Sequence, residues 1–315
     1  MKINLGIAPI AWSNDDMPEL GGDTPIETCL EEASKSGFSG IELGGKFPRN
    51  PGIIKFLLNK YQLKMPGGWY GSLLRKRSVE EEWSAMKDHI DLLKFVKSDV
   101  FVFADVSDSI QSLGDIPLKS RPKLEDSEWT SYGKKISEIS NRLFDIGLPM
   151  SYHEHMGTII QTEEDVDRFI NETNDKTFLL YYTGHLLFAE ANYENILKKY
   201  ISRINHVHCK DIRKNILENS LSNNLSFRDS FLKGVFTVPG DGCIDYLPLL
   251  KILYQNKYNK WLVIEAEQDP DKANPYIYAQ KGYSYLKSVI GGINYYLKTK
   301  NRIPKNYFGE HKWFS

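Results

Sequence analysis

The sequence predicts an α/β fold, a closed (β/α)8 TIM barrel, and three observations carry this prediction. Eight short β-type runs are each followed by a helical pattern, and successive parallel strands need such a helical crossover. Eight units within 315 residues match the length of a single barrel. The first run leads into residues 8–12 without the glycine-rich phosphate turn that usually announces the rival fold, a doubly wound open sheet.

The helical segments carry recognisable ends. Pro25 takes a favoured first-turn position, Thr162 offers an N-cap, and Gly37 and Gly147 can each end a helix. The expected strands are residues 5–10, 40–44, 64–69, 99–104, 149–153, 177–182, 204–209 and 261–265. The expected helices are residues 25–36, 51–61, 79–95, 127–146, one opening at residue 162, 192–200, 245–255 and 276–297.

The sequence indicates one domain, over residues 1–297, followed by a basic and aromatic tail over residues 298–315. This tail could pack on a neighbouring subunit of a homo-oligomer or be a loosely ordered terminus.

Composition excludes several classes of protein. The formal net charge of -1 argues against a general nucleic-acid binder, which usually needs a basic excess. No run approaches the roughly 18 apolar residues of a transmembrane helix, and the opening residues do not form a signal peptide. Cys29, Cys209 and Cys243 cannot all pair with one another, so a reducing compartment is the simplest home. We therefore expect a cytoplasmic protein without a nucleic-acid or membrane partner.

Polar side chains gather where the last four predicted strands end, which is where barrels of this type place their active sites. Five of the seven histidines lie there, together with two acids: His153, His155, His185, His206, His208, Asp211 and Glu265. Imidazole and carboxylate are the usual ligands of Mn, Co, Zn or Fe, so these residues predict a metal or acid–base site. The alternative is a hydrogen-bonded polar layer without metal. The other two histidines, His89 and His311, are expected at the surface.

Four further residues are candidates for contacting a substrate. Trp12 and Trp69 follow predicted strands, and their rings could pack against a sugar or cyclitol ring or in the core. Lys46 could face a polyol or a carbonyl oxygen, although solvated loop cations are more common. Asp241 lies in a Gly-Asp-Gly turn and would gain meaning only if it faced the strand ends.

Several stretches resemble the inosose dehydratases (2-keto-myo-inositol dehydratases), in register from about residue 5 to about residue 287. They are residues 6–16, 155–158, 161–163, 183–185, 205–211, 234–245 and 265–270, of which 234–245 is the most specific. The resemblance implies a xylose-isomerase-like barrel that removes water from 2-keto-myo-inositol (scyllo-inosose). The implied product is 3D-(3,5/4)-trihydroxycyclohexane-1,2-dione, an intermediate of inositol catabolism. Mn or Co and glutathione are the implied cofactors, and a small cyclitol is the implied substrate.

The resemblance also implies a set of metal ligands, one from each of the last four strands. By position these are His153 (or His155), Tyr182, His208 and Glu265. The chain departs from the family pattern here, because the family motif Asp-Thr-Gly-His begins with Tyr182 in this sequence.

A neutral phenol with a pKa of about 10 is a poor ligand, so we expect weakened metal binding first. Two alternatives are that Tyr182 binds as tyrosinate or that Glu154 supplies the missing carboxylate; Glu154 itself stands where the family carries histidine.

Dehydration beside a ketone needs a base for the α-proton, an acid for the departing hydroxyl, and stabilisation of the oxyanion. We expect Glu265 or a fifth-strand histidine as the base, and His185 or His155 as the acid. Lys210 could support the oxyanion if metal is missing. Two other functions stay open. One is a sugar or cyclitol isomerase or epimerase, and the other is a metal-poor, inactive ligand-binding homologue.

Overall fold

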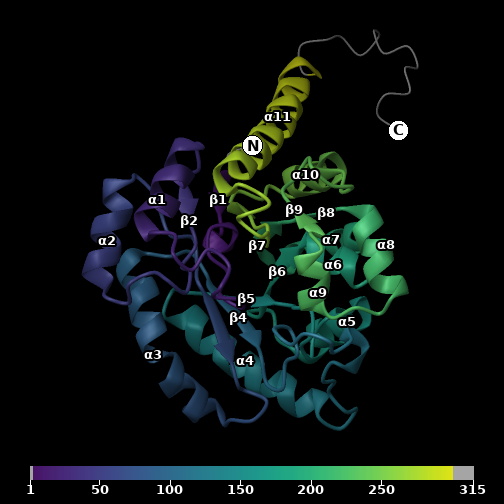
Figure 1. The fold of residues 1–315 in the computed structure, drawn as a ribbon. Helices are drawn as coiled ribbons and strands as arrows, with labels where there is room; N and C mark the ends of the chain where they lie inside the picture. Colours follow the sequence, from purple (N-terminus) through teal and green to yellow (C-terminus); the bar gives the residue numbers. More distant parts are fainter. Residues whose placement is uncertain (1–2, 301–315) are drawn as a thin grey trace.

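The computed structural model describes residues 3–300, and its core is a barrel of eight parallel strands ringed by helices (Figure 1). The strand order is β2-β1-β10-β7-β6-β5-β4-β3, and two isolated parallel bridges, Gly40–Lys64 and Leu43–Gly68, connect its two ends. The predicted barrel is confirmed. Its strands are β1 Asn4–Ile7, β2 Gly40–Ile41, β3 Trp69–Ser72, β4 Phe101–Asp105, β5 Met150–His153, β6 Phe178–Tyr182, β7 Ile204–Cys209 and β10 Trp261–Ile264.

The surrounding helices lie close to the predicted ranges. Ser78 caps α3 and Thr162 caps α5, each in a reciprocal capping box, so the N-cap expected at residue 162 is confirmed. The main crossover helices are α1 Ile26–Lys35, α2 Pro51–Lys60, α3 Val79–Val96, α4 Trp129–Asp145, α5 Glu163–Glu172, α7 Tyr193–Tyr200, α10 Tyr246–Gln255 and α11 Pro275–Lys300. Short 3-10 helices are η1 Pro9–Ala11, η2 Leu118–Ser120 and η3 Ile201–Arg203.

One strand prediction was displaced. Residues 64–69 were expected to form the third strand, but β3 is Trp69–Ser72 and shares only Trp69 with that range. Pro66 has no N–H to donate to a ladder, so this stretch touches β2 only at the two isolated bridges. The Pro66 carbonyl instead accepts from the backbone of Asp99 and Val100.

Further elements at the mouth of the barrel were not predicted, since they lie outside the eight strand–helix units. They are α6 Thr183–Phe188, α8 Lys214–Ser222, α9 Phe227–Leu232 and the antiparallel pair β8 Asp211–Ile212 and β9 Phe236–Thr237. The Asp211 carboxylate accepts from the backbone N–H groups of four residues: Ile212, Gly240, Gly242 and Ile244. Asp211 was expected in a metal or acid–base site, and the structure shows its carboxylate binding the backbone of this hairpin and turn instead.

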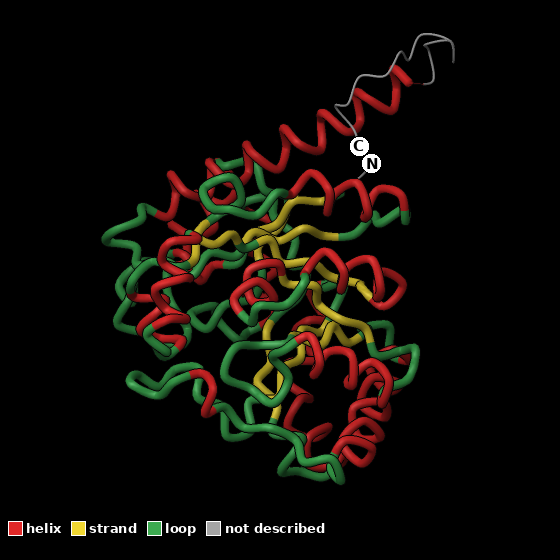
Figure 2. Tube along the Cα trace, turned by 90° about the vertical axis from the view of Figure 1, so that its right-hand side faces the viewer, coloured by secondary structure: helices red, strands yellow, loops and turns green. Residues whose placement is uncertain are grey.

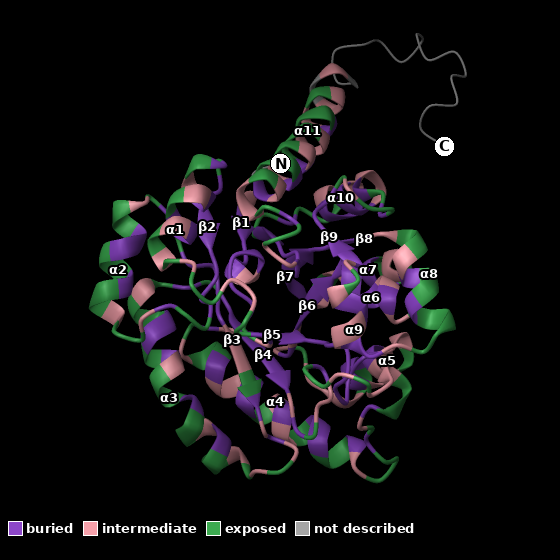
Figure 3. Cartoon of the chain, in the orientation of Figure 1, coloured by how far each residue is buried: buried purple, intermediate pink, exposed green. Residues whose placement is uncertain are grey.

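Near the amino ends of the strands, the barrel interior is filled with apolar side chains. Trp261 packs with Ala8 and Val263, and its Nε1 donates to Asp99 Oδ2 at 2.6 Å. Gly40 faces this ring, because a Cβ there would lie 2.8 Å from the indole. Most strand residues are buried, apart from β3 with its exposed Gly71, whereas the ring of helices exposes its outer faces (Figure 3). The interior is therefore apolar at the amino ends of the strands, whereas polar side chains cluster at their carboxyl ends.

Helix α11 leaves the barrel and extends away from it (Figures 1 and 2). The predicted tail lies outside the described residues beyond Lys300, as does His311. Within residues 3–300, no helix combines the length and apolar character needed to cross a bilayer.

Candidate functional site

A cavity opens at the carboxyl ends of the strands, and its walls are rich in carboxylates and imidazoles. Its polar and aromatic lining consists of Asp15, Asp16, Glu42, Trp69, Gln111, His153, His155, His208, Glu265 and Glu267. Within the described part of the chain, no lysine or arginine lines it. The predicted histidines of β5 and β7 and the predicted glutamate after β10 therefore meet in one place.

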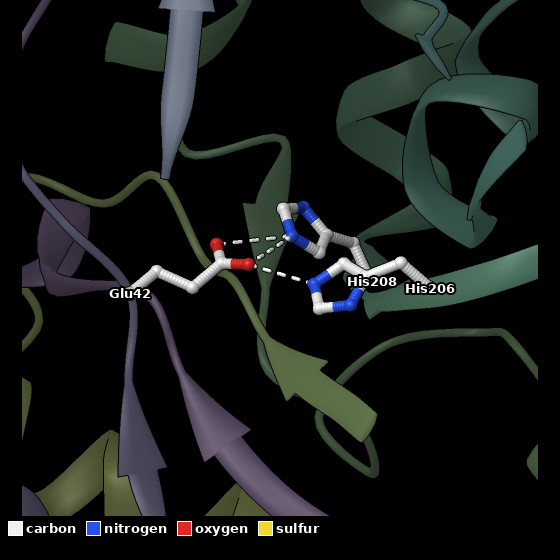
Figure 4. Close-up of side chains that lie close together, drawn as sticks. All are labelled: Glu42, His206 and His208. Carbon is white, nitrogen blue, oxygen red and sulfur yellow. Dashed lines mark hydrogen bonds and ion pairs between the residues drawn. The ribbon is translucent and has the colours of Figure 1, made fainter. Parts of the chain in front are cut away.

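His208 lies between two carboxylates on opposite sides of its ring. Its Nδ1 is 3.0 Å from Glu265 Oε2, and its Nε2 is 3.1 Å from Glu42 Oε2. Glu42 also accepts from His206 Nε2 at 2.7 Å, so one carboxylate that follows β2 holds two histidines of β7 (Figure 4). The sequence analysis missed Glu42. Sequence could have indicated it, because Glu42 lies two residues after Gly40, which faces the barrel interior, and alternate residues of a strand point to the same face.

Charges and burial set the protonation of these groups. Burial opposes the ionised form of Glu42, but His208 and His206 lower its pKa to about 2. Burial would lower the pKa of His208, but Glu42 and Glu265 together raise it to about 10. Burial likewise opposes ionisation of Glu265, yet His208 and Lys210 hold its pKa well below the usual range. In the absence of a metal, His208 therefore stabilises the negative charge of Glu42, and His208 and Lys210 together stabilise that of Glu265.

His153, the last residue of β5, and His155, two residues later, are neutral, because burial lowers the pKa of both. His153 Nδ1 donates to the backbone oxygen of Glu154, and His155 Nδ1 donates to that of Met156 at 2.8 Å. Each ring therefore keeps Nε2 as a free lone pair for a metal or a proton.

The donor set of His153, His208 and Glu265 fits a divalent metal. One ligand atom from each lies within 4.8 Å of the others, and all three residues line the cavity. His208 Nδ1 lies 3.0 Å from the Glu265 carboxylate but makes no hydrogen bond. Two ligand atoms that each lie about 2.1 Å from one ion are about 3 Å apart. Glu42 on the outer nitrogen of His208 completes the carboxylate–histidine arrangement that orients metal ligands.

Two other groups of potential ligands are close by. One combines Glu42 with His206 and His208, and the other combines His155, His185 and Glu267. His153 and His155 thus belong to different groups, a distinction that the sequence analysis left open. Burial raises the pKa of Glu267 to about 7, which Lys210 partly opposes. The sequence analysis assigned Glu267 no role.

Tyr182 lies outside all three groups. It is fully buried beside Val102 and Leu180, and its hydroxyl donates to Glu265 Oε1. Burial, reinforced by Glu265, raises its pKa well above the usual value, so the side chain is a neutral phenol. The structure therefore places Tyr182 as a hydrogen-bond donor to an expected ligand.

Glu154 does not replace the missing carboxylate in this arrangement. Both of its carboxyl oxygens are buried, neither has a hydrogen-bond partner, and it belongs to none of the three ligand groups. Burial raises its pKa well above the usual range, although Lys210 and His208 oppose this.

Lys210 and His185 form a layer behind the cavity wall. Lys210 Nζ is 3.1 Å from Glu267 Oε2, 3.4 Å from Glu265 Oε1 and 3.3 Å from His185 Nε2. It also lies 4.7 Å from the centre of the Tyr182 ring. Neither Lys210 nor His185 lines the cavity: Lys210 lies behind the lining residues Glu265 and Glu267, and His185 lies behind His155, with ring centroids 4.5 Å apart.

Of the four expected substrate contacts, only Trp69 lines the cavity, where its ring packs edge-on against His153 and His155. Trp12 is in the core, and its Nε1 donates to Glu32 at 2.6 Å. Lys46 Nζ donates to the backbone of the loop before α1, at Gly22 and Thr24. Asp241 pairs with Arg213 and Lys281 and accepts from Thr237, away from the cavity.

His89 was expected at the surface, and that prediction was wrong. The side chain is half-buried, and its Nε2 donates to the Gly68 carbonyl at 3.2 Å. Burial lowers its pKa to about 4. Its ring packs against Tyr70 and Phe101, so it belongs to the packing between α3 and the barrel.

Comparison with known proteins agrees with this architecture. Residues 30–288 match the family model described as a xylose isomerase-like TIM barrel. The chain is 40% identical over 303 residues to the rhizopine catabolism protein MocC of Rhizobium meliloti, which covers 95% of this chain and 92% of that protein. It is 40% identical over 292 residues to the inosose dehydratase of Geobacillus thermodenitrificans, covering 92% of this chain and 98% of that enzyme.

Solved structures with the same fold are more distant in sequence. The probable 3-DHS dehydratase AsbF from Bacillus anthracis has a TM-score of 0.67 at 14% identity, covering 91% of this chain and 99% of that one. The IolI protein with a bound zinc atom has a TM-score of 0.65 at 15% identity, covering 91% of this chain and 96% of that one. From the family match and the extent of the sequence identity, the chain belongs to the inosose dehydratase family of xylose isomerase-like TIM barrels.

Proposed function

We propose that this protein is a hydro-lyase that removes water from 2-keto-myo-inositol (scyllo-inosose) to give the corresponding trihydroxycyclohexanedione in inositol catabolism. The observation that carries the proposal is one cavity in which His153, His208 and Glu265 converge beside two further proton-transfer groups, His155 and Glu267. The relatives at about 40% identity named inosose dehydratase support the choice of substrate.

His153, His208 and Glu265 would hold the metal, with Glu42 fixing the outer nitrogen of His208. A divalent ion bound there would supply Lewis-acid polarisation of a ketone oxygen. Tyr182 donates to Glu265 Oε1 and so leaves Oε2, the atom near His208, free of this hydrogen bond.

Two residues that line the cavity and lie outside this ligand group carry the proton steps. His155 presents an unprotonated Nε2, which takes the proton from the carbon next to the ketone. Glu267 lies in the same ligand group as His155 and gives a proton to the hydroxyl that leaves from the neighbouring carbon. The C–H and C–O bonds break, one water departs, and the C=C bond that forms belongs to the enol of the dione. The enol becomes the dione when its hydroxyl loses a proton and the carbon that held the departing hydroxyl gains one. Lys210, 3.1 Å from Glu267, stabilises the carboxylate that remains.

Two finer features of the proposal come from the family resemblance: Mn or Co would be the metal, and glutathione a second cofactor. The cytoplasm as compartment follows from the cysteine content and the opening residues of the sequence, and a homo-oligomer from the possibility that the tail packs on a neighbouring subunit. Cys29 and Cys209 are buried and Cys243 is exposed, and the three are free thiols, as a reducing compartment would keep them.

The direct test is an ultraviolet assay of dione formation from scyllo-inosose. We expect turnover that a chelator removes and that added Mn or Co restores, with glutathione omitted in a parallel series. Mass spectrometry of the product checks the reaction class, because a dehydratase product is lighter by one water whereas an isomerase or epimerase product keeps the substrate mass. Absence of turnover under all of these conditions would contradict the proposal.

Glu42→Gln should weaken metal binding about 10- to 100-fold, because the amide no longer supplies the negative charge that fixes the outer nitrogen of His208. Equilibrium dialysis with Mn or Co measures this. Glu82→Gln is the matched control, since Glu82 is also a fully buried carboxylate but pairs with Arg77 outside the site. Equal losses of affinity in the two variants would show that burial, not the contact with His208, explains the effect.

A further inference from the structure

One buried side chain on the cavity wall has an unused hydrogen-bonding atom. Gln111, in the loop between β4 and α4, is 8% exposed and lines the cavity. Its Nε2 donates to Asp16 Oδ1 at 3.1 Å, while its Oε1 is buried with no hydrogen-bond partner. A buried amide oxygen without a partner is costly unless a ligand donates to it.

Asp16 provides a second acceptor next to the first. It also lines the cavity, and among residues 3–300 its only side-chain hydrogen bond is the one from Gln111 to Oδ1. Oδ2 therefore stays available. Asn14 Oδ1 accepts from the backbone N–H groups of Asp16 and Met17, both at 2.8 Å, and so fixes this part of the loop after β1.

The Gln111 backbone is fixed from the other side by the turn that follows His155. Ile110 N donates to the Gly157 carbonyl at 3.0 Å. Gly157 has φ of +79°, and a Cβ there would lie 2.9 Å from Gln111 N. The turn thus requires glycine and joins Gln111 rigidly to the element that carries the β5 histidines.

We infer that Asp16 and Gln111 form a binding subsite for two neighbouring hydroxyl groups of an uncharged polyol, at the part of the ring that does not react. Both free atoms are acceptors, so each needs a donor such as a hydroxyl, and neither suits a carbonyl, carboxylate or phosphate oxygen. The inference rests on the proposed function for the identity of the ring and deepens it by excluding anionic substrates.

The charge of the cavity supports this exclusion. Five carboxylate side chains line the cavity: Asp15, Asp16, Glu42, Glu265 and Glu267. No lysine or arginine of the described residues lines it. A phosphorylated cyclitol or sugar would bring further negative charge next to these carboxylates, at a subsite where no lysine or arginine of the described residues could pair with it, which disfavours its binding.

The test compares wild type with Gln111→Leu and Asp16→Asn. Isothermal titration calorimetry gives Kd for scyllo-inosose, myo-inositol and an inositol monophosphate, and the dione assay gives KM and kcat. We expect each substitution to weaken binding of both neutral cyclitols about 10-fold or more, with a matching rise in KM and with kcat and metal affinity changed less than about threefold. Wild type should bind the monophosphate at least about 10-fold more weakly than myo-inositol, and Asp16→Asn should narrow this gap.

Asp108→Asn is the control, because Asp108 lies in the same loop as Gln111 but forms an exposed pair with Lys76. Unchanged cyclitol affinity in both variants, tight monophosphate binding by wild type, or a wild type that binds no cyclitol would each overturn the subsite. Its fate is separable from that of the dehydratase proposal. If the protein binds cyclitols without releasing water, the dehydratase proposal is refuted and the subsite is retained. If the variants turn over scyllo-inosose with unchanged KM, the subsite is refuted and the dehydratase proposal is retained.

Discussion

Glu265→Gln is expected to weaken metal affinity at least about 100-fold and to lower turnover of scyllo-inosose about 1000-fold or more. Glu265 is the only carboxylate in the group with His153 and His208, and a neutral amide binds a divalent ion poorly. The substitution also leaves Lys210, buried 3.4 Å from Oε1, with Glu267 as its remaining carboxylate partner. Equilibrium dialysis and the dione assay measure the two effects separately.

Glu267→Gln is the matched control for this experiment. It follows the same strand two residues later and also lines the cavity, but it lies in the group with His155 and His185. If it acts as the acid, turnover should fall about 100-fold while metal affinity stays within about threefold of wild type. A parallel loss of metal binding in both variants would contradict the division of the cavity into a metal group and a proton-transfer group.

The barrel could be predicted from sequence because each of its units repeats the same local signals. β6 is a short run of apolar and aromatic residues, and helices such as α5 begin at a clear cap, so their positions follow from local chemistry. The elements that were missed, β8 and β9, have two residues each and depend on the Asp211 carboxylate, which accepts from backbone far along the chain. No local pattern carries that information.

The site was only half predictable for the same reason. The histidines stood out because they are rare and lie at strand ends, and position along a strand tells which ones point inward. Glu42 follows β2, more than 160 residues before its partners on β7, and one glutamate at a strand end does not reveal that its side chain reaches β7. Trp12 shows the opposite error, since its place after β1 suggested a ligand contact, but the structure buries it against α1 through Glu32.

Tyr182→Asp is expected to raise the affinity for Mn or Co at least about 10-fold. Wild type purified without chelator should carry well below one equivalent of metal, because Tyr182 offers a neutral hydroxyl that is already bound to Glu265. Aspartate would add a negatively charged oxygen on β6, beside His208, which pairs with residue 182 across the sheet. Metal analysis and dialysis measure the gain.

Tyr182→Asp should also lower the free energy of unfolding. The effect on stability can be measured separately from the effect on metal affinity. Tyr182 is fully buried among Val102, Leu180 and Lys210, so a smaller side chain leaves a cavity and buries a carboxylate, with a loss of about 2–4 kcal/mol in the absence of metal. Saturating metal should recover part of the loss, because a ligand that binds only the folded state stabilises it. Thermal unfolding with and without Mn measures both changes.

Tyr182→Phe distinguishes the loss of the phenol from the gain of a carboxylate. It keeps the ring and its packing but removes the hydrogen bond to Glu265, which frees Oε1 without adding a ligand. We expect its metal affinity to rise only a few-fold and its unfolding temperature to respond weakly to Mn. If Tyr182→Phe gained as much affinity as Tyr182→Asp, the weak binding of wild type would come from competition for Glu265 rather than from the missing fourth ligand. If neither variant gained, or if wild type already held a full equivalent, Tyr182 would not limit the metal site at all.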